Sequence, residues 1–267
     1  MRHQIALETL AAEEYSIVKS FFKDLKFYKS FLDCILEQRC EGTVVVDHRH
    51  NPTFALVFCP PRPANLYAPV YFAGEFDPII IPFLKAFSKI SLITSLDWEH
   101  RSLFEEAGFK PLERMQLRRA NPVFELASWN PFFPTQYSIS PINEKNFAQC
   151  TWYPFISACY ATEECFFRNG IGFCLIDQGK IVTESYAIIA GETAEIGIVT
   201  DSAYRGQNLG TLICAMTLDY CYKNNIAPIW NCDVHNVASA AIAKKLGFEV
   251  DSHYCYLNWI APEGSEI

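Results

Sequence analysis

The sequence predicts an α+β (α/β) fold, because short β-branched segments are followed by turns and by longer stretches with helical periodicity. The clearest example is residues 195–200, which are short and β-branched and therefore read as a strand. Turn residues 201–203 follow this strand. From Leu209 to about Asn224, apolar side chains recur at roughly helical spacing. The functional interpretation depends on this strand–turn–helix unit.

Composition limits the class of protein. Half of the 267 residues are hydrophobic, enough for a sizeable core in two small domains or one large one. No stretch approaches the ~20 apolar residues of a membrane span, and residues 1–8 contain no apolar signal core. The eleven cysteines form no Cys-x-x-Cys pairs, which favours buried thiols in a reducing compartment. The net charge of −8 argues against a nucleic-acid partner. We therefore expect a cytoplasmic protein that binds neither nucleic acid nor a membrane.

The turn at residues 205–211 has the composition of an anion site. It opens a helix, where the first backbone N–H groups and the positive end of the helix dipole favour a negative charge. Gly206 and Gly210 would let the backbone approach a pyrophosphate, and Arg205 can add a bidentate charged contact. Thr211 can cap the helix or reach a phosphate oxygen. An ordinary strand–turn–helix with glycine at its start would have the same pattern, because short glycine motifs often match by chance.

Two motifs resemble those of the GCN5-related N-acetyltransferase (GNAT) superfamily. Its signature (Arg/Gln)-x-x-Gly-x-(Gly/Ala) corresponds here to Arg205-Gly206-Gln207-Asn208-Leu209-Gly210. Its second signature, Asn-x-x-Ala-x-x-Leu-Tyr-x-Lys-x-Gly-Phe, corresponds to residues 236–248, from Asn236 to Gly247-Phe248. The resemblance covers roughly residues 137–259. Within it, residues 230–248 are similar to a bacterial subgroup that includes zwittermicin-resistance-type acetyltransferases.

The resemblance implies a central mixed, mostly antiparallel sheet and an acetyl-CoA (coenzyme A) site. The thioester would lie in a gap between the strand before the 205–211 turn and the strand after its helix. Backbone groups around Val199 would bind the pantetheine arm, with an N–H there as oxyanion donor, and Asn236 would bind it from the other side. The implied cofactor residues are Ile198, Val199, Thr200, Arg205, Gly206, Gln207, Asn208, Leu209, Gly210, Thr211, Asn236 and Ser239.

Two departures from the family pattern concern the site directly. Asn208 replaces the central glycine, and asparagine tolerates left-handed backbone better than other non-glycine residues, so the turn can keep its shape. Ala243 replaces the tyrosine that often protonates the departing thiolate, which leaves the general acid unassigned. Tyr254 and Tyr256 could replace it, although tyrosines on a last strand are more often core residues.

Acetyl transfer needs a neutral amine, an oxyanion stabiliser and a proton for the thiolate. Glu195 is our first choice of base, acting directly or through water; the alternative is a solvated residue at a strand end. Asp233 and His235 follow the next strand and could bind or deprotonate the amine, and His235 could equally shape the turn before Asn236. Cys232 could form an acyl-enzyme, but a buried cysteine fits better and the resemblance implies direct transfer.

The elements of the second half follow the family order. After a strand at 137–141 and helical residues at 143–168, a hairpin joins strands 172–176 and 181–189 through the turn 177–180. Strand 195–200 and its helix come next, then a strand at 228–233, the helix from 236, and a last strand at 250–259. The family's final strand is therefore either missing or supplied by the first half.

The first half repeats several of these features. Residues 103–109 resemble 242–248, and Asp97 lies eleven residues before Gly108, as Asn236 lies eleven before Gly247. A hairpin at 43–46 and 53–58 precedes a strand at 67–73, but the following residues 74–78 are acidic and lack the Arg-Gly turn. We infer a degenerate copy of the same fold that lost its phosphate site, so that the chain binds one cofactor. A helix that ends in Gly-Phe is also a common C-cap.

These observations divide the chain into three parts. We expect a degenerate N-terminal domain at 1–120, a packed apolar linker at 121–136, and a CoA-binding domain at 137–267. The leading amphipathic helical region, 7–38, could cover a sheet or form a homodimer contact. Asp47-His48-Arg49-His50 has two histidines in one turn but no third ligand at useful spacing, so we expect a solvated loop and no metal.

The predicted function is acetyl transfer from acetyl-CoA to the amine of a small molecule, such as an amino sugar, an amino acid or an antibiotic-like molecule. The alternative is a non-catalytic CoA-binding or scaffold protein that kept the fold, which Ala243 and Asn208 favour. The identity of the acceptor does not follow from the sequence.

Overall fold

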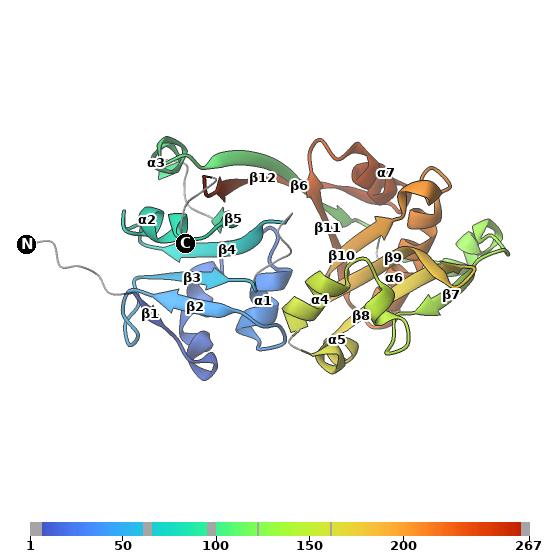
Figure 1. Cartoon of the computed structure of the whole chain (residues 1–267), viewed down its shortest axis with the longest axis horizontal. Helices are drawn as coiled ribbons and strands as arrows, with labels where there is room; N and C mark the ends of the chain where they lie inside the picture. The colour runs from blue at the N-terminus through green and yellow to red at the C-terminus, as the bar shows by residue number, and fades with distance from the viewer. Residues whose placement is uncertain (1–6, 61–65, 95–99, 122, 161, 263–267) are drawn as a thin grey trace, which may run out of the picture. The chain divides into compact units, whose positions relative to one another are not determined.

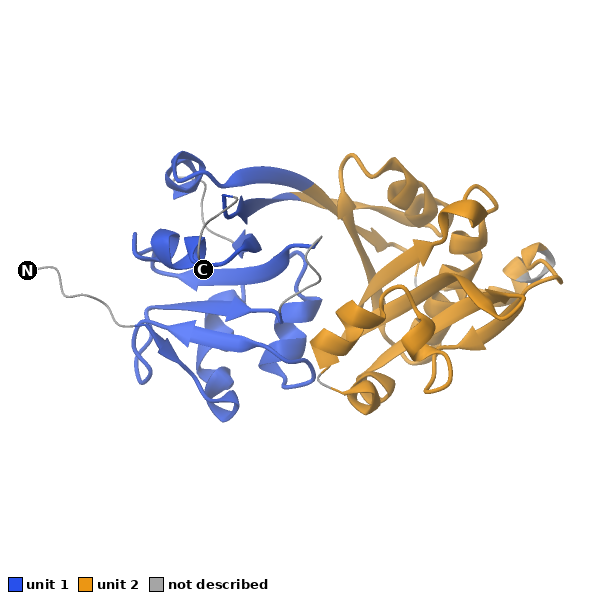
Figure 2. Ribbon diagram, viewed as in Figure 1, with its two compact units in different colours: residues 1–113, 254–267 blue, residues 114–253 orange. Residues whose placement is uncertain are grey.

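The computed structural model describes residues 7–60, 66–94, 100–121, 123–160 and 162–262 (Figure 1). The chain forms two compact units, unit 1 with Met1–Glu113 and Tyr254–Ile267, and unit 2 with Arg114–His253 (Figure 2). Residues 254–267, which we assigned to the second domain, thus belong to unit 1. Asp97, part of the argument for an internal repeat, lies outside the described residues.

Unit 1 is a mixed sheet with short helices. Its strands are β1 (Glu8–Thr9), β2 (Thr43–Val46), β3 (Phe54–Phe58), β4 (Ala68–Gly74) and β5 (Lys89–Thr94). Strands β1 to β4 are antiparallel neighbours, β4 and β5 are parallel, and the end of β12 (Phe248–Ile260) pairs antiparallel with β5. The helices are η1 (Ala12–Phe22), α1 (Ser30–Leu36), α2 (Ile80–Lys85) and α3 (Arg101–Glu106). The predicted helical region 7–38 is therefore a short strand and two separate helices.

Unit 2 has the same order of strands. They are β7 (Ser138–Pro141), β8 (Gly170–Asp177), β9 (Lys180–Ala190), β10 (Thr193–Thr200) and β11 (Ala227–Asp233). Strands β7 to β10 are antiparallel neighbours, β10 and β11 are parallel, and β6 (Lys110–Arg119) pairs antiparallel with β11. The helices are η3 (Leu126–Phe132), η4 (Phe147–Gln149), α4 (Tyr153–Tyr160), α5 (Glu163–Asn169), η5 (Ser202–Tyr204), α6 (Leu209–Lys223) and α7 (Val237–Lys245).

The two units have the same series of strand pairings. In each, four strands pair antiparallel one after another, and the fourth pairs parallel with a fifth. The fifth strand then pairs antiparallel with a strand from the other half of the sequence. This is the tandem arrangement that the internal similarity predicts.

The halves of the sequence exchange strands. In unit 2, Arg114–Arg118 of β6 lie beside β11; in unit 1, Leu257–Ile260 of β12 lie beside β5. The final strand that the resemblance implies after β12 is thus supplied to the second half by β6 of the first half, one of the two alternatives left by the sequence. The domain boundaries differ from the predicted ones because β6 and β12 are each long enough to contribute to both units.

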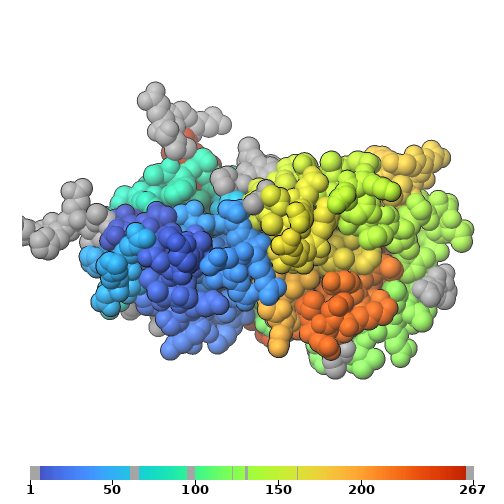
Figure 3. All heavy atoms as spheres, turned by 90° about the horizontal axis from the view of Figure 1, so that it is seen from below, coloured from blue at the N-terminus to red at the C-terminus, as the bar shows by residue number. Residues whose placement is uncertain are grey.

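The predicted linker belongs to unit 2. Phe124, Leu126 and Trp129 pack against its core, whereas Phe132 is 66% exposed. The ring of Phe124 stacks on Tyr222 of α6, with centroids 6.2 Å apart. Figure 3 shows the segment that contains η3 in green and α6 in orange on one face of the molecule. The apolar linker therefore extends the core of unit 2.

The core of unit 2 fixes the position of α6. Its side chains include Ala194 and Ile196 of β10, Cys214 and Leu218 of α6, and Trp230 of β11, all under 5% exposed. All eleven cysteines are free thiols, and ten of them are buried, in agreement with their predicted use as small apolar residues. Among the described residues, no helix combines the length and the apolar character needed to span a bilayer.

Candidate functional site

Strands β10 and β11 begin as a parallel pair and then separate. They pair only from Thr193↔Ala227 to Glu195↔Ile229, although β10 continues to Thr200 and β11 to Asp233. Beyond Glu195, the register of β10 continues with β9, and that of β11 with β6. A gap therefore opens between two strands of the sheet, as the resemblance implied.

Strand alternation decides which backbone groups face this gap. The register of β10 with β9 is regular from Thr193 to Thr200. The Asp201 N–H donates to the Val182 carbonyl (2.9 Å), and the Thr183 hydroxyl donates to the Val199 carbonyl (2.9 Å), so Val199 faces β9. Because successive residues alternate, the backbone groups of Ile198 and Thr200 face the gap. Of the backbone groups around Val199 that we expected to bind the ligand, those of Ile198 and Thr200 thus face the gap, whereas those of Val199 face β9.

The loop that follows β10 is held by side chains at both ends. The Asp201 carboxylate accepts from the Ala203 N–H (3.0 Å) and from Lys180 Nζ (2.6 Å), and Lys180 lowers the pKa of Asp201. The Tyr204 hydroxyl donates to Asp177 (2.8 Å), and the Tyr137 hydroxyl to Gln207 (3.2 Å). These hydrogen bonds fix the shape of the loop that leads into α6.

The conformations of the loop agree with the predicted role of Asn208. Its φ is +61°, so asparagine adopts the left-handed backbone that the family glycine would adopt. Gly206 also has positive φ, +78°, and an added Cβ there would have no atom within 4 Å. Gly210 has a different role: a Cβ would lie 2.8 Å from Ile198 Cδ1 and 3.2 Å from Thr200 Oγ1. The absence of a Cβ at Gly210 thus allows α6 to pack closely on β10, and the expected backbone approach of a pyrophosphate to this residue stays a prediction.

A cavity of about 530 Å³ lies at the N-termini of α6 and α7, a size typical of small-ligand sites. All the predicted cofactor residues line it except Gln207. The first backbone N–H groups of an α-helix have no partner within the helix, and here those of Leu209, Gly210 and Thr211 border the cavity. Residues that the prediction did not include also line it: Tyr204, Ala238, Ala241, Ile242 and Lys245.

The start of α7 is fixed by its own side chains. The Asn236 Oδ1 accepts from the Ser239 N–H (3.0 Å) and caps the helix. The Ser239 hydroxyl accepts from Trp230 Nε1 (2.9 Å) and also contacts the Cys232 thiol. Asn236 thus fixes the start of the helix with its side-chain oxygen.

Two cationic side chains border the cavity. Arg205 Nε donates to the Thr200 carbonyl (3.2 Å), and Lys245 Nζ donates to Asn208 Oδ1 (2.6 Å); both side chains belong to exposed residues. The sequence contained a signal for Lys245, because Ala238, Ala241 and Lys245 recur at helical spacing and share one face of α7. Both cations can reach an anion at the helix N-terminus.

Of the three predicted catalytic residues, Glu195 lies where the strands separate. The residue is 7% exposed, and its carboxylate accepts from Asn231 Nδ2 of β11 (2.7 Å), on the sheet face opposite Ala194, Ile196 and α6. Asp233 instead shapes the turn before α7: its carboxylate accepts from the His235 N–H (2.7 Å), and its carbonyl accepts from the Asn236 N–H (3.0 Å). His235 is exposed in that turn, in line with its alternative interpretation.

The other candidates lie in core positions. Tyr254 and Tyr256 belong to unit 1, where their rings lie 4.4 Å from Phe27 and 5.4 Å from Tyr28, respectively. Cys232 is 3% exposed, and burial raises the pKa of its thiol, which disfavours an acyl-enzyme. Ala243 is fully buried.

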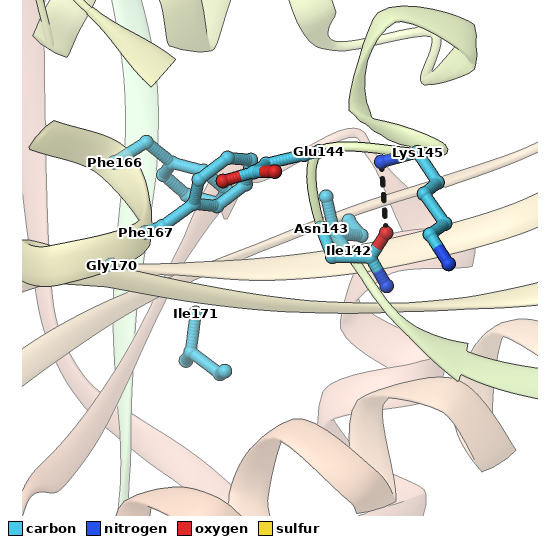
Figure 4. A pocket seen from close by; sticks show the side chains of 8 residues that line it. All are labelled: Ile142, Asn143, Glu144, Lys145, Phe166, Phe167, Gly170 and Ile171. Carbon is cyan, nitrogen blue, oxygen red and sulfur yellow. Dashed lines mark hydrogen bonds between the residues drawn. The ribbon is translucent and has the colours of Figure 1, made fainter. Parts of the chain in front are cut away.

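Two further features carry none of the predicted chemistry. A second cavity of unit 2, about 360 Å³, is lined by Phe166 and Phe167 beside the Asn143–Lys145 turn (Figure 4). In the 47–50 loop, the Asp47 carboxylate accepts from the Thr53 N–H (2.9 Å) and hydroxyl (2.6 Å) and closes the hairpin. The described residues include no group of three or more potential metal ligands.

Comparisons with known proteins cover both units. The model of a family described as GNAT acetyltransferase matches residues 19–257. The protein named "Uncharacterized N-acetyltransferase YdfB" from Bacillus subtilis is 28% identical over 268 residues, which covers 93% of this chain and 97% of that protein. A crystal structure of a GCN5-related N-acetyltransferase-like protein from Streptococcus suis has a TM-score of 0.75 at 21% identity, over 93% and 99% of the chains.

A tandem GNAT protein from the clavulanic acid biosynthesis pathway is also similar. Its TM-score is 0.63 at 14% identity, over 97% of this chain and 100% of that one. At these identities the two solved structures support the fold alone. Both of them match nearly the full length, so the duplicated arrangement recurs in solved structures.

Proposed function

The chain belongs to the GNAT acetyltransferase family, and on this premise we propose that it transfers an acetyl group from acetyl-CoA directly to the amine of a small molecule. The observation that carries this proposal is the gap between β10 and β11, which adjoins the cavity at the N-termini of α6 and α7. A thioester needs such a gap to meet an acceptor, and its phosphates need the helix end.

The residues of the cavity suit coenzyme A. The N–H groups at the start of α6, together with Arg205 and Lys245, offer donors and positive charge to a pyrophosphate. Asn208 and Gly206 keep the loop backbone open, without side-chain atoms near Gly206. The backbone of Ile198 and Thr200 offers a strand edge to the amides of the pantetheine arm.

The face opposite α6 suits the acceptor. When acetyl-CoA is bound, it supplies the activated acyl group. Glu195 can take a proton from the attacking amine, and Asn231 holds its carboxylate in place. The Ile198 N–H faces the gap and can donate to the oxyanion. Direct transfer is favoured because Cys232 is buried with a raised pKa.

The alternative is a protein that binds CoA without catalysis. One of the two features that favoured it loses weight, because Asn208 adopts the required backbone. The other, Ala243 at the family tyrosine position, still favours it.

Two measurements test the proposal. Saturating coenzyme A should raise the melting temperature of the wild type, and Arg205→Glu should abolish most of that shift, since it reverses a charge at the cavity. Arg168→Glu is the matched control, because Arg168 pairs with Glu164 on α5 and does not line the cavity. Consumption of acetyl-CoA with amino sugars, amino acids and aminoglycosides as acceptors then tests catalysis.

The outcomes separate the alternatives. Absence of a shift at saturating coenzyme A, or equal shifts in wild type and Arg205→Glu, would rule out the proposed cofactor site. A clear shift without thioester consumption for any amine would favour the non-catalytic alternative.

A further inference from the structure

The side chain of Tyr186 on β9 lies over Gly197 of the neighbouring strand β10. It is 7% exposed and directly opposite Gly197 of β10. A Cβ added to Gly197 would lie 2.2 Å from Tyr186 Cζ and 2.5 Å from its hydroxyl oxygen. No real side chain tolerates such distances, so Gly197 provides the space in which the phenol end of Tyr186 lies.

This position is beside the opening of the strands. Gly197 comes two residues after Glu195, the last residue of β10 that pairs with β11, and directly before Ile198, whose backbone faces the gap. Glu195 and Asn231 lie on the same sheet face as Tyr186, because residues two apart on a strand share a face. A phenol, a carboxylate and an amide therefore share one face of the sheet beside the place where β10 and β11 separate.

The Tyr186 ring is held in place by the segment that begins α4. Its edge-to-face neighbour is Trp152, with centroids 5.7 Å apart at 66°. The backbone there is in turn bound to the sheet by the buried Glu184, which accepts from the N–H groups of Thr151 (2.9 Å) and Trp152 (2.8 Å). A fixed ring can present its hydroxyl to a ligand without a loss of side-chain entropy.

We propose that Tyr186 is the general acid of the transfer and donates its phenolic proton to the departing sulfur. The inference rests on the proposed function. As the amine nitrogen bonds to the acetyl carbon, the carbon–sulfur bond breaks and its electron pair stays on sulfur. The sulfur takes the proton of Tyr186 while Glu195 takes one from the amine. Transfer of that proton from Glu195 to the tyrosinate through solvent restores both groups, so the products are the acetylated amine and a neutral thiol.

The deciding experiment compares two ligands that differ only at the sulfur. Tyr186→Phe keeps the ring and removes the hydroxyl. Its dissociation constants for coenzyme A and desulfo-coenzyme A are measured by calorimetry. We expect coenzyme A to bind about fivefold more weakly, as for one lost hydrogen bond, and desulfo-coenzyme A to bind as in the wild type. With acetyl-CoA, kcat should fall by roughly a hundredfold or more at little change in KM.

A second variant and a control guard against a purely structural explanation. Gly197→Ala displaces the phenol and should reproduce the selective loss for coenzyme A. Tyr71→Phe makes the same change in unit 1, where that hydroxyl donates to the Tyr28 carbonyl (2.8 Å), and should alter neither affinity.

The results distinguish this inference from the function on which it rests. Equal weakening of both ligands in Tyr186→Phe would reduce Tyr186 to a packing residue. Unchanged affinities with unchanged kcat would exclude contact with the sulfur. Either result overturns the inference while wild-type activity stands. A wild type that bound neither ligand would overturn both proposals.

Discussion

Units 1 and 2 share one order of strands but differ where their parallel strands meet. In unit 1, β4 and β5 pair from Ala68↔Ile90 to Phe72↔Thr94, up to the last residue of β5. In unit 2, the corresponding pair ends at Glu195↔Ile229, and both strands continue apart. The parallel strands β4 and β5 of unit 1 thus stay paired, whereas β10 and β11 of unit 2 separate after Glu195.

The loop after the strand differs in the same sense. In unit 1 it leads to α2, a helix of six residues, and in unit 2 to α6, a helix of fifteen. The Asp77 carboxylate accepts from the Ile79 N–H (2.8 Å) at the start of α2, where unit 2 offers N–H groups to a cavity. An internal carboxylate thus lies where the other copy would hold an external anion. The comparison indicates that the fold can form without two features of unit 2, the separated strands and the free N–H groups of the helix, which are the features that the proposed ligand site uses.

The largest expected effect concerns the exchanged strand in unit 1. Trp259 is 7% exposed, lies 5.5 Å from the Phe109 ring, and donates from Nε1 to the Phe87 carbonyl (3.1 Å). Trp259→Ala should lower the free energy of unfolding by about 3–5 kcal/mol in urea titrations, as large core truncations do. Coenzyme A affinity at a temperature where the variant is folded should stay unchanged. A parallel loss of affinity would contradict the assignment of the ligand to unit 2 alone.

Two glycines, Gly74 at the end of β4 and Gly206 in the loop after β10, should respond differently to alanine: stability should fall more at Gly74, and coenzyme A affinity should fall only at Gly206. A Cβ on Gly74 (φ +108°) would lie 2.3 Å from the Thr53 carbonyl oxygen, so Gly74→Ala should destabilise by roughly 2–4 kcal/mol. Gly206 has open space around it, and Gly206→Ala should lose only about 1–2 kcal/mol of stability from backbone strain. Ligand titration calorimetry should show weaker coenzyme A binding for Gly206→Ala only. Equal affinities in both variants would remove the distinction.

Removing one charge at the end of α7 and one at the end of α3 tests whether only unit 2 binds the phosphates of coenzyme A. Lys245 borders the cavity, and Glu106 occupies the equivalent position in the first half. Lys245→Gln should weaken coenzyme A binding by roughly three- to tenfold at low salt and by less at high salt, because salt screens exposed charges. Glu106→Gln should leave the affinity unchanged. A salt-independent loss for Lys245→Gln would argue against a phosphate contact.

The smallest effect is expected at Asn208. Asn208→Gly restores the family residue at φ +61° but removes the hydrogen bond to Lys245 (2.6 Å). These changes oppose each other, so stability should change by less than about 1 kcal/mol, measured by thermal unfolding. Coenzyme A affinity should stay within about threefold of wild type. A large gain in affinity would mean that asparagine impairs the loop in this protein.

The local parts of the site could be predicted from sequence because they depend on neighbouring residues. Asn208 takes the left-handed backbone, and Asn236 caps α7 three residues before its partner Ser239. The direction in which Val199 faces could not be predicted, because it depends on the register of β10 with β9. The position of Tyr186 depends in the same way on its pairing with Gly197, eleven residues away and on another strand.

The fold was predictable to the same degree. The repeat appeared in the sequence, and with it the question of a missing strand. Which strands are exchanged could not be predicted, because Ser91 and Asn258, whose side chains hydrogen-bond, are 167 residues apart in the sequence. No local pattern specifies a partner at that distance.

That separation matters while the protein is being made. Ribosomes add about 5–20 residues per second, so β5 would wait on the order of ten to thirty seconds for the strand that pairs with its outer edge. Throughout this interval an apolar strand, Lys89–Thr94, presents unpaired backbone groups, a common starting point for aggregation. Protection of the β5 edge until β12 has been synthesised would therefore limit aggregation of the nascent first half, and chaperones are suited to this role.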